Sequence, residues 1–245
     1  MKGGGAPPHA IHGPLDPRGV GCSVRGKVTA SRATGSVIAL TLAAALGVGG
    51  FEPPRWKDGS VPQIPQQTSA WGQVLLEVSV GAAGQVEKAT ILRSSPPFAE
   101  ILQKTVVGWR FDPAMVDGTP SPGRVLVGAI FRPPALPDAP GLGEPPRDLA
   151  EPSDSVPFPT SIVTPLYPPR ALGDGVVLLE VIVGGDGKAL TATVLRSAPG
   201  FDESAKQASL QWKFRPARRN GSPIFARAVL VFAFRQPIVS KPRPK

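Results

Sequence analysis

The chain contains the same segment twice, and this duplication limits its possible folds more than any other feature. Residues 72–134 align with residues 175–237 at a constant offset of 103 positions, without a gap, and more than a third of the aligned residues are identical. Both copies contain the pattern W-x-F-x-P-A-x-x-x-G-x-P, which begins at Trp109 and again at Trp212. A fixed internal period indicates that one folded unit has been duplicated, so the sequence predicts two related domains of roughly 70 residues each.

Each copy contains the same series of expected elements. In the second copy, β-branched residues and leucines predict a first strand over Val176–Val183, and a more polar second strand follows over Ala189–Arg196. The glycines between them are typical of a hairpin turn. An apolar stripe from Phe201 to Trp212 predicts a helix, which must end before Pro216 because proline disfavours helical geometry in the preceding residue.

The last strand of each copy decides how the sheet is arranged. In the second copy it follows a turn at Asn220-Gly221 and is expected over Phe225–Arg235. The helix returns the chain, so the last strand pairs most simply antiparallel to the first. The predicted fold class is therefore α+β, with two small β-β-α-β domains, each a three-stranded antiparallel-type sheet with one helix packed on it. In the strand order 2-1-3, strand three is an edge with unpaired backbone groups.

Alternating residues define two faces on these strands. In the last strand, one face carries Ala228, Leu230, Phe232 and Phe234, and the other carries Arg227, Val229, Val231, Ala233 and Arg235. The first strand, Val176–Val183, is apolar on both faces, which is typical of a central strand that is covered on both sides.

The side chains that recur in both copies have structural interpretations. We expect Trp109 with Phe111, and Trp212 with Phe214, to close each helix onto its sheet, because small domains need large aromatic side chains for burial. Glu77 and Glu180 occupy equivalent positions in the two first strands. We expect these carboxylates to be solvated or paired with the arginines of the second strands, Arg93 and Arg196.

The side-chain inventory argues against an enzyme. All histidines and the single cysteine, which are His9, His12 and Cys22, lie near the N-terminus, so residues 23–245 contain neither residue type. This excludes nucleophile pairs based on His or Cys, and zinc sites built on those ligands, from most of the chain. We expect a non-enzymatic protein with no cofactor, no metal site and no catalytic residues.

The N-terminal region predicts export or membrane anchoring. Residues 1–36 are rich in glycine, proline and scattered charge, and we expect a disordered or misannotated extension there. An apolar run over residues 37–51 follows three basic residues. Its length is typical of the apolar part of a signal peptide, and an alternative is a short inner-membrane anchor. We therefore expect a periplasmic protein, exported by a signal peptide or anchored in the inner membrane.

The positive charge does not by itself indicate a nucleic-acid partner. The formal net charge is +9. An excess of positive charge is compatible with binding to nucleic acid or to an anionic envelope surface, but it is equally compatible with a soluble basic protein that has no such partner. Nucleic-acid recognition would require a basic face with stacking aromatic residues, and an exported protein rarely meets that ligand. We expect no nucleic-acid partner.

Proline-rich segments set the domain boundaries. The sequence predicts a first, degraded domain at residues 61–134, a linker at 135–159, a second domain at 160–237 and a basic tail at 238–245. The proline content of the linker is typical of a semi-rigid, extended spacer.

The second copy resembles the C-terminal domain of TonB-family proteins. The resemblance rests on a Tyr-Pro lead-in, a G-x-V strand, a D-G hairpin, and a helix followed by W-x-F-x-P and G-x-P. These features correspond in this chain to Tyr167-Pro168, Gly175, Asp186-Gly187, Ser197, Trp212, Phe214, Pro216, Gly221 and Pro223. The first copy is a degraded version, with Ile64-Pro65 in place of the Tyr-Pro lead-in.

The resemblance implies a periplasmic domain of a Gram-negative envelope. In the family, the TonB box of an outer-membrane transporter adds a strand along the third strand of the domain, and the Tyr-Pro segment lies in the contact region. Carried over to this chain, the peptide-binding candidates are Tyr167, Pro168, Arg227, Val229, Val231, Ala233 and Arg235. The apolar run has no histidine and the long spacer of TonB proper is absent, so coupling to a motor is not expected.

Two functional hypotheses follow. The first is a non-enzymatic protein that binds an extended peptide of an outer-membrane transporter or another envelope protein by strand addition, with a link to TonB-dependent transport. The alternative is a structural envelope protein whose two domains dock on each other or form a homodimer. Strands that are apolar on both faces favour the alternative.

Overall fold

A computed structural model describes residues 50–63, 65, 70–132 and 145–236. The expected N-terminal extension, residues 37–49 of the apolar run, the first part of the linker and the basic tail lie outside the described residues. Within the described part of the chain, no helix is long and apolar enough to cross a membrane.

The long elements of the two copies correspond one to one. In the first copy they are β3 (Gly72–Val80), β4 (Val86–Ser94), α2 (Phe98–Val107) and β8 (Gly123–Phe131). In the second copy they are β11 (Gly175–Val183), β12 (Ala189–Arg196), α3 (Asp202–Leu210) and β16 (Ala226–Phe234). The strands match the expected elements of the second copy to within one residue at every end.

Short strands surround these elements. Before and within the first copy lie β1 (Phe51–Glu52), β2 (Arg55–Asp58), β5 (Arg110–Asp112), β6 (Ala114–Val116) and β7 (Thr119–Ser121). Before and within the second copy lie β9 (Arg147–Asp148), β10 (Phe158–Ser161), β13 (Lys213–Arg215), β14 (Ala217–Arg219) and β15 (Ser222–Ile224).

The long strands form one seven-stranded sheet in the order β12-β11-β16-β8-β3-β4-β9. The order 2-1-3 is confirmed within each copy. The expectation of two separate three-stranded sheets is wrong, because β16 and β8, the third strands of the two copies, pair in parallel. The same pairing means that neither third strand is an edge.

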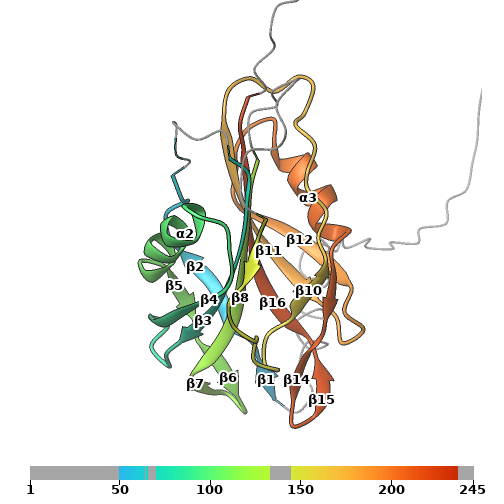
Figure 1. The fold of residues 1–245 in the computed structure, drawn as a ribbon. Helices are drawn as coiled ribbons and strands as arrows, with labels where there is room; N and C mark the ends of the chain where they lie inside the picture. Colours follow the sequence, from blue (N-terminus) through green and yellow to red (C-terminus); the bar gives the residue numbers. More distant parts are fainter. Residues whose placement is uncertain (1–49, 64, 66–69, 133–144, 237–245) are drawn as a thin grey trace, which may run out of the picture. The chain divides into compact units, whose positions relative to one another are not determined.

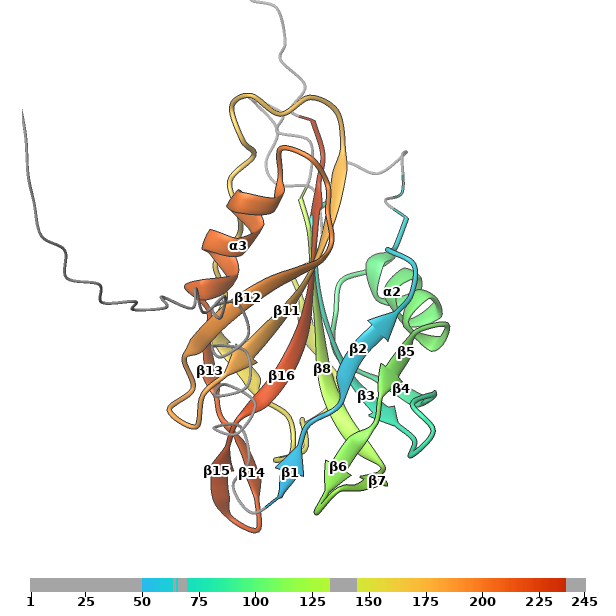
Figure 2. The same ribbon diagram turned by 180° about the vertical axis from the view of Figure 1, so that it is seen from behind.

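The two helices lie on opposite faces of this sheet (Figures 1 and 2). The third strands of the two copies, β8 and β16, run parallel to each other. A half-turn about an axis along these strands therefore superimposes one copy on the other. Such a half-turn preserves the strand direction but exchanges the two faces of the sheet. Each helix therefore packs on strands of its own copy and covers part of the other. Val229, Val231 and Ala233 of β16 are buried in the core that contains Leu102 and Val106 of α2.

The second core is the counterpart of the first. Leu126 and Ile130 of β8 are buried in the core that contains Ala205 of α3. The same core contains one face of β16, namely Ala228, Leu230, Phe232 and Phe234. This explains why β3, β11 and β16 are apolar on both faces, since each face belongs to a different core. The expectation that the first strand is central and covered twice is confirmed.

The helix of the second copy ends earlier than its apolar stripe suggests. Helix α3 ends at Leu210, and Trp212 follows the C-cap residue Gln211. Trp212 is 1% exposed, and its indole N–H donates a hydrogen bond of 2.9 Å to the carbonyl of Val163. The equivalent Trp109 donates to the carbonyl of Ser60 at 2.8 Å. The paired aromatic residues are therefore buried, as expected, and each tryptophan also fixes the segment that leads into its copy.

Candidate functional site

The predicted peptide-binding strand lies in the middle of the sheet. Residues 226–234 of β16 pair with β11 on one side, and residues 228–233 also pair with β8 on the other. Val229, Val231 and Ala233 are each 1% exposed or less. The predicted strand addition required β16 to be an edge strand. It is not an edge, because the side of β16 that faces away from β11 is hydrogen-bonded to β8 of the first copy.

The two arginines of this candidate set are also engaged. Arg227 donates to Oε1 of Glu180 at 2.6 Å. Arg235 lies 3.7 Å from a carboxylate oxygen of Asp174 and donates to the carbonyl of Pro65 at 3.1 Å. Their side chains are mostly buried, at 16% and 14% exposure. Both arginines therefore contribute to internal ion pairs along β16.

Tyr167 and Pro168 lie in a surface turn. The Tyr167 hydroxyl donates to the carbonyl of Gly173 at 2.8 Å, and its ring stands edge-on to Phe201 with centroids 5.5 Å apart. Desolvation and the nearby Asp174 carboxylate raise the pKa of the Tyr167 hydroxyl above its ordinary value, which favours the protonated, donating form. The carbonyl of Pro168 accepts a hydrogen bond from Ala171. Tyr167 therefore holds the turn that precedes β11.

The turn around Tyr167 combines a fixed backbone with exposed apolar side chains. Leu166 and Leu172 are 78% and 86% exposed. The backbone N–H of Gly173 donates to the side chain of Gln236, which ties the turn to the end of β16. The structure therefore places Tyr167 near Arg235, whereas Arg227 lies near the opposite end of the same strand.

The buried glutamates have different partners from those expected. Glu77 accepts from Nη1 of Arg124 at 2.6 Å, and Glu180 accepts from Nη1 of Arg227 at the same distance. Pairing with Arg93 and Arg196 is wrong, because those arginines lie opposite Leu75 and Leu178 and reach other carboxylates. Identity at the repeat offset does not decide between the two sets of partners, because Arg93 and Arg196 are identical at that offset, as Arg124 and Arg227 are.

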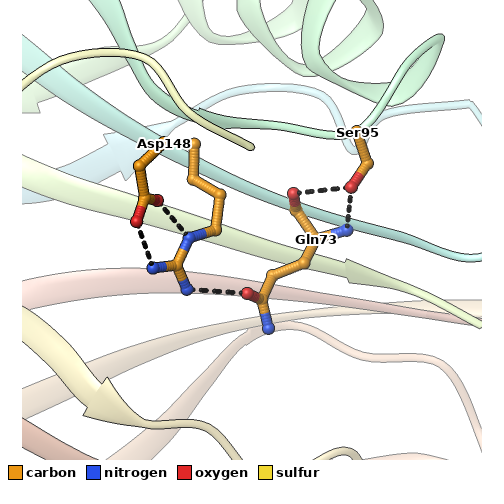
Figure 3. A network of polar contacts seen from close by, with 4 residues as sticks. Gln73, Ser95 and Asp148 are labelled. Atoms are coloured by element: carbon orange, nitrogen blue, oxygen red, sulfur yellow. Dashed lines mark hydrogen bonds and ion pairs between the residues drawn. The ribbon is translucent and has the colours of Figure 1, made fainter. Parts of the chain in front are cut away.

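Arg93 anchors part of the expected linker. Its Nε and Nη2 donate to the two carboxylate oxygens of Asp148 at 2.6 and 3.1 Å, and its Nη1 donates to Oε1 of Gln73 at 2.8 Å. Ser95 in turn bonds the backbone of Gln73 (Figure 3). The hydrogen bonds from Arg93 lower the pKa of Asp148 below its ordinary value.

The described half of the linker is not a free spacer. Strand β9 pairs with the end of β4, and the backbone N–H of Ser153 donates to Oε2 of Glu77 at 2.8 Å. Val156 is fully buried in the core of the second copy. Residues 147–156 therefore cross from the first copy to the second as a docked segment, which ends in a turn at residues 154–155. No sequence pattern indicated this docking, because proline and charge patterns describe extension but not contact.

At the opposite end of the sheet, no described strand pairs with the outer edge of β12. Strand β12 is the terminal strand on that side within the described residues. Residues 189–195 of β12 contain no charged side chain, although edge strands are commonly protected by charge. A groove of about 700 Å³ begins beside Lys188 and Ala189 and is lined on another side by Leu210 and Lys213.

The comparison with protein families agrees with this geometry. The family described as Gram-negative bacterial TonB protein C-terminal matches residues 62–133 and 163–235, which together make up more than half of the chain. The chain belongs to this family. It carries two TonB C-terminal domains in tandem, as the repeat predicted, and the family indicates a TonB-like envelope protein. Comparison with curated proteins gave no match.

Proposed function

We propose that this chain is a non-enzymatic, TonB-like protein of the Gram-negative periplasm that binds an extended segment of an envelope partner. Export by a signal peptide in residues 37–51, or anchoring by them, is part of the proposal. The observation that carries it is the parallel pairing of β16 with β8 inside a TonB-family double domain. Because the third strands occupy each other, a partner must bind to another surface of the same double domain.

An outer-membrane protein is the class of partner that family membership favours. The exposed leucines beside Tyr167 and the uncharged edge of β12 are surfaces on which such a partner can bind. Coupling to TonB-dependent transport is a further proposal, and it rests on the family alone.

A second candidate function is favoured by one observation. The two copies share both hydrophobic cores, so the double domain is a single packed unit of the kind that suits a scaffold for other envelope proteins. The two candidates differ in the partner: a binding module recognises a short peptide, whereas a scaffold requires a folded protein.

The test joins β8 and β16 covalently. Ala129 and Val231 are partners in the parallel pairing and lie in the same core. Adjacent strands are about 4.8 Å apart, which allows a disulfide between cysteines at these two positions. We expect the oxidised Ala129→Cys, Val231→Cys chain, with Cys22→Ser to remove the native thiol, to bind TonB-box peptides as tightly as the reduced chain does.

Two results would overturn the proposed function. If oxidation abolishes peptide binding and reduction restores it, the peptide enters at an opened β16. If neither form binds any box peptide, or if the full chain is found in the cytoplasm after fractionation of a Gram-negative host, the envelope binding role fails. Binding of folded outer-membrane domains without binding of their isolated peptides would favour the scaffold instead.

A further inference from the structure

The first copy already holds an extended segment on its outer face, and that segment is the chain's own residues 147–153. The backbone N–H of Leu149 donates to the carbonyl of Leu92 at 2.8 Å, and β9 pairs with Arg93 and Ser94. Farther along, Ser153 donates its backbone N–H to the buried Oε2 of Glu77. A peptide is thus recognised here by a strand edge and one buried carboxylate oxygen.

The second copy has the equivalent surface, and no segment among the described residues covers it. The repeat offset places Leu195 and Arg196 where Leu92 and Arg93 lie, and Glu180 where Glu77 lies. No strand of the described chain pairs with the outer edge of β12. Arg196 binds Asp58 and the carbonyl of Gly59 instead of a segment like β9.

The carboxylate of Glu180 lacks one partner that Glu77 has. Glu180 is 5% exposed and its Oε2 has no hydrogen-bond partner among the described residues, whereas Oε1 is bound by Arg227. Arg55 comes no closer than 3.9 Å to Oε1, and its side chain is 62% exposed. A buried acceptor without a donor costs free energy, so a ligand that brings an N–H group to this oxygen gains affinity.

The described part of the chain's own lead-in, which begins at Gly50, does not supply that donor. Gly50 stands 103 positions before Ser153 and is therefore the equivalent residue. Its carbonyl accepts a hydrogen bond from the backbone N–H of Asp117, and Oε2 of Glu180 nevertheless remains without a partner in the described chain. The described residues therefore supply a backbone donor to Oε2 of Glu77 but none to Oε2 of Glu180.

We infer that the outer edge of β12, together with the carboxylate of Glu180, is a binding site for an extended peptide segment of a partner protein. The segment pairs with β12 beside Leu195 and donates a backbone N–H to Oε2 of Glu180, in the same way that residues 147–153 bind the first copy. The inference rests on the proposed function and adds the place and mode of binding. It moves recognition away from β16 to the opposite end of the second copy's three strands.

A peptide with the chain's own linker sequence is the appropriate probe. We would label a synthetic peptide of residues 146–154, PRDLAEPSD, and titrate the full chain with it while recording fluorescence anisotropy. The first copy is already occupied by the same sequence within the chain, at a high effective concentration. Binding of the added peptide therefore reports on the second copy.

The variant Thr193→Lys is designed to occupy Oε2 of Glu180 with a donor from the chain itself. Thr193 is exposed and lies directly across from Glu180 in the pairing of β11 with β12, so a lysine there can reach the free oxygen. We expect the variant to fold with an unchanged or higher Tm and to bind the probe about tenfold more weakly or worse. The probe is net negative, so an added lysine attracts it at long range and a weaker affinity must have a local cause.

The matched control is Thr90→Lys, the same substitution across from Glu77 in the first copy. It should leave probe affinity unchanged within about twofold, and hydrogen exchange on binding should slow in residues 189–196 but not in residues 86–94. Equal weakening by both variants, or protection of β4 instead of β12, overturns the inference.

The remaining outcomes separate this site from the proposed function. If the probe does not bind while box peptides bind the disulfide-linked chain, the β12 site fails and the proposed function stands. If the probe binds only a chain that begins at Gly50, residues 1–49 occupy the site themselves, and the inference of a partner site is overturned.

Discussion

Gly84 and Gly187 occupy the same position in the two copies and connect each main hairpin to the segment after the helix. Their φ angles are +81° and +80°, and their carbonyls accept hydrogen bonds from the N–H groups of Phe111 and Phe214 at 2.9 and 2.8 Å. A Cβ at Gly187 would lie 2.0 Å from the Phe214 carbonyl oxygen. Only glycine fits a position that combines positive φ with so close an approach of backbone.

Replacing Gly187 should therefore cost more than replacing a turn glycine that has space around it. We expect Gly187→Ala to lower the free energy of unfolding by more than about 2 kcal/mol, because the new methyl group clashes and φ is unfavourable. Gly221→Ala is the control, since Gly221 has a similar φ of +79° and a Cβ added there would have no atom within 4 Å. It should cost only about 1–2 kcal/mol. Urea denaturation measures both values, and equal losses would contradict the steric explanation.

At the scale of residues, the sequence predicted burial well and ion pairs poorly. The two rows of β16 and the buried aromatic pairs follow from alternation, which depends only on local geometry. Which arginine meets Glu180 depends instead on register and on the pairing of β11 with β16, where Arg227 lies opposite Ile182. Register is a property of two strands together, so the composition of one strand does not reveal it.

At the scale of elements, the docked part of the linker has the least evident sequence signal. Its polar contacts with the first copy include a two-residue strand, the bond from the Leu149 N–H to the Leu92 carbonyl, the ion pair between Arg93 and Asp148, and the bond from Ser153 to Glu77. A segment held by so few polar contacts is expected to open at a lower free-energy cost than the central strands. Its docking should therefore respond to the charge of Asp148 without unfolding of the sheet.

Acid should release this segment. The hydrogen bonds from Arg93 lower the folded pKa of Asp148 below 3.8, so its ion pair stabilises docking above about pH 4. That stabilisation is lost as the pH falls through the lower, folded value. The NMR shift of the Leu149 amide, which bonds the Leu92 carbonyl, follows the release. Asp148→Asn should show the released shift already at pH 7.

A second aspartate provides the control for this titration. The pKa of Asp186 is also lowered, chiefly by the backbone N–H of Lys188, but Asp186 lies in the turn between β11 and β12. Asp186→Asn should leave the Leu149 amide shift and its pH dependence unchanged. A Leu149 shift that moves at pH 7 in both variants would show that the response is not due to the ion pair.

At the scale of the whole molecule, the pairing of β16 with β8 changes the relation between the two domains. Local patterns predicted the order 2-1-3 correctly, but they left the third strand as an edge. Nothing in the sequence of β16 alone specifies a parallel partner about 100 residues away. The apolar residues on both faces of the first strand were the available signal, because two separate domains would leave one of those faces uncovered.

Separate copies should not be stable monomers. Residues 50–132 and 145–236, produced as two chains, would each expose the apolar face that the other normally covers, including Val229 and Val231. We expect each alone to self-associate or to lack a cooperative unfolding transition, and an equimolar mixture to recover a folded one-to-one complex. Sedimentation and circular dichroism measure this. A single copy that folds as a monomer would contradict the shared-core explanation.

The fusion of both halves into one sheet has a consequence for how the protein can diversify. A symmetric assembly of identical subunits carries every surface twice, and each substitution appears on both sides. Here each substitution appears once, so the two halves can differ: Oε2 of Glu77 accepts a hydrogen bond from Ser153, whereas Oε2 of Glu180 has no partner among the described residues. The chain is in effect a covalent heterodimer with fixed stoichiometry, in which one half can specialise in recognition while the other supports its shape.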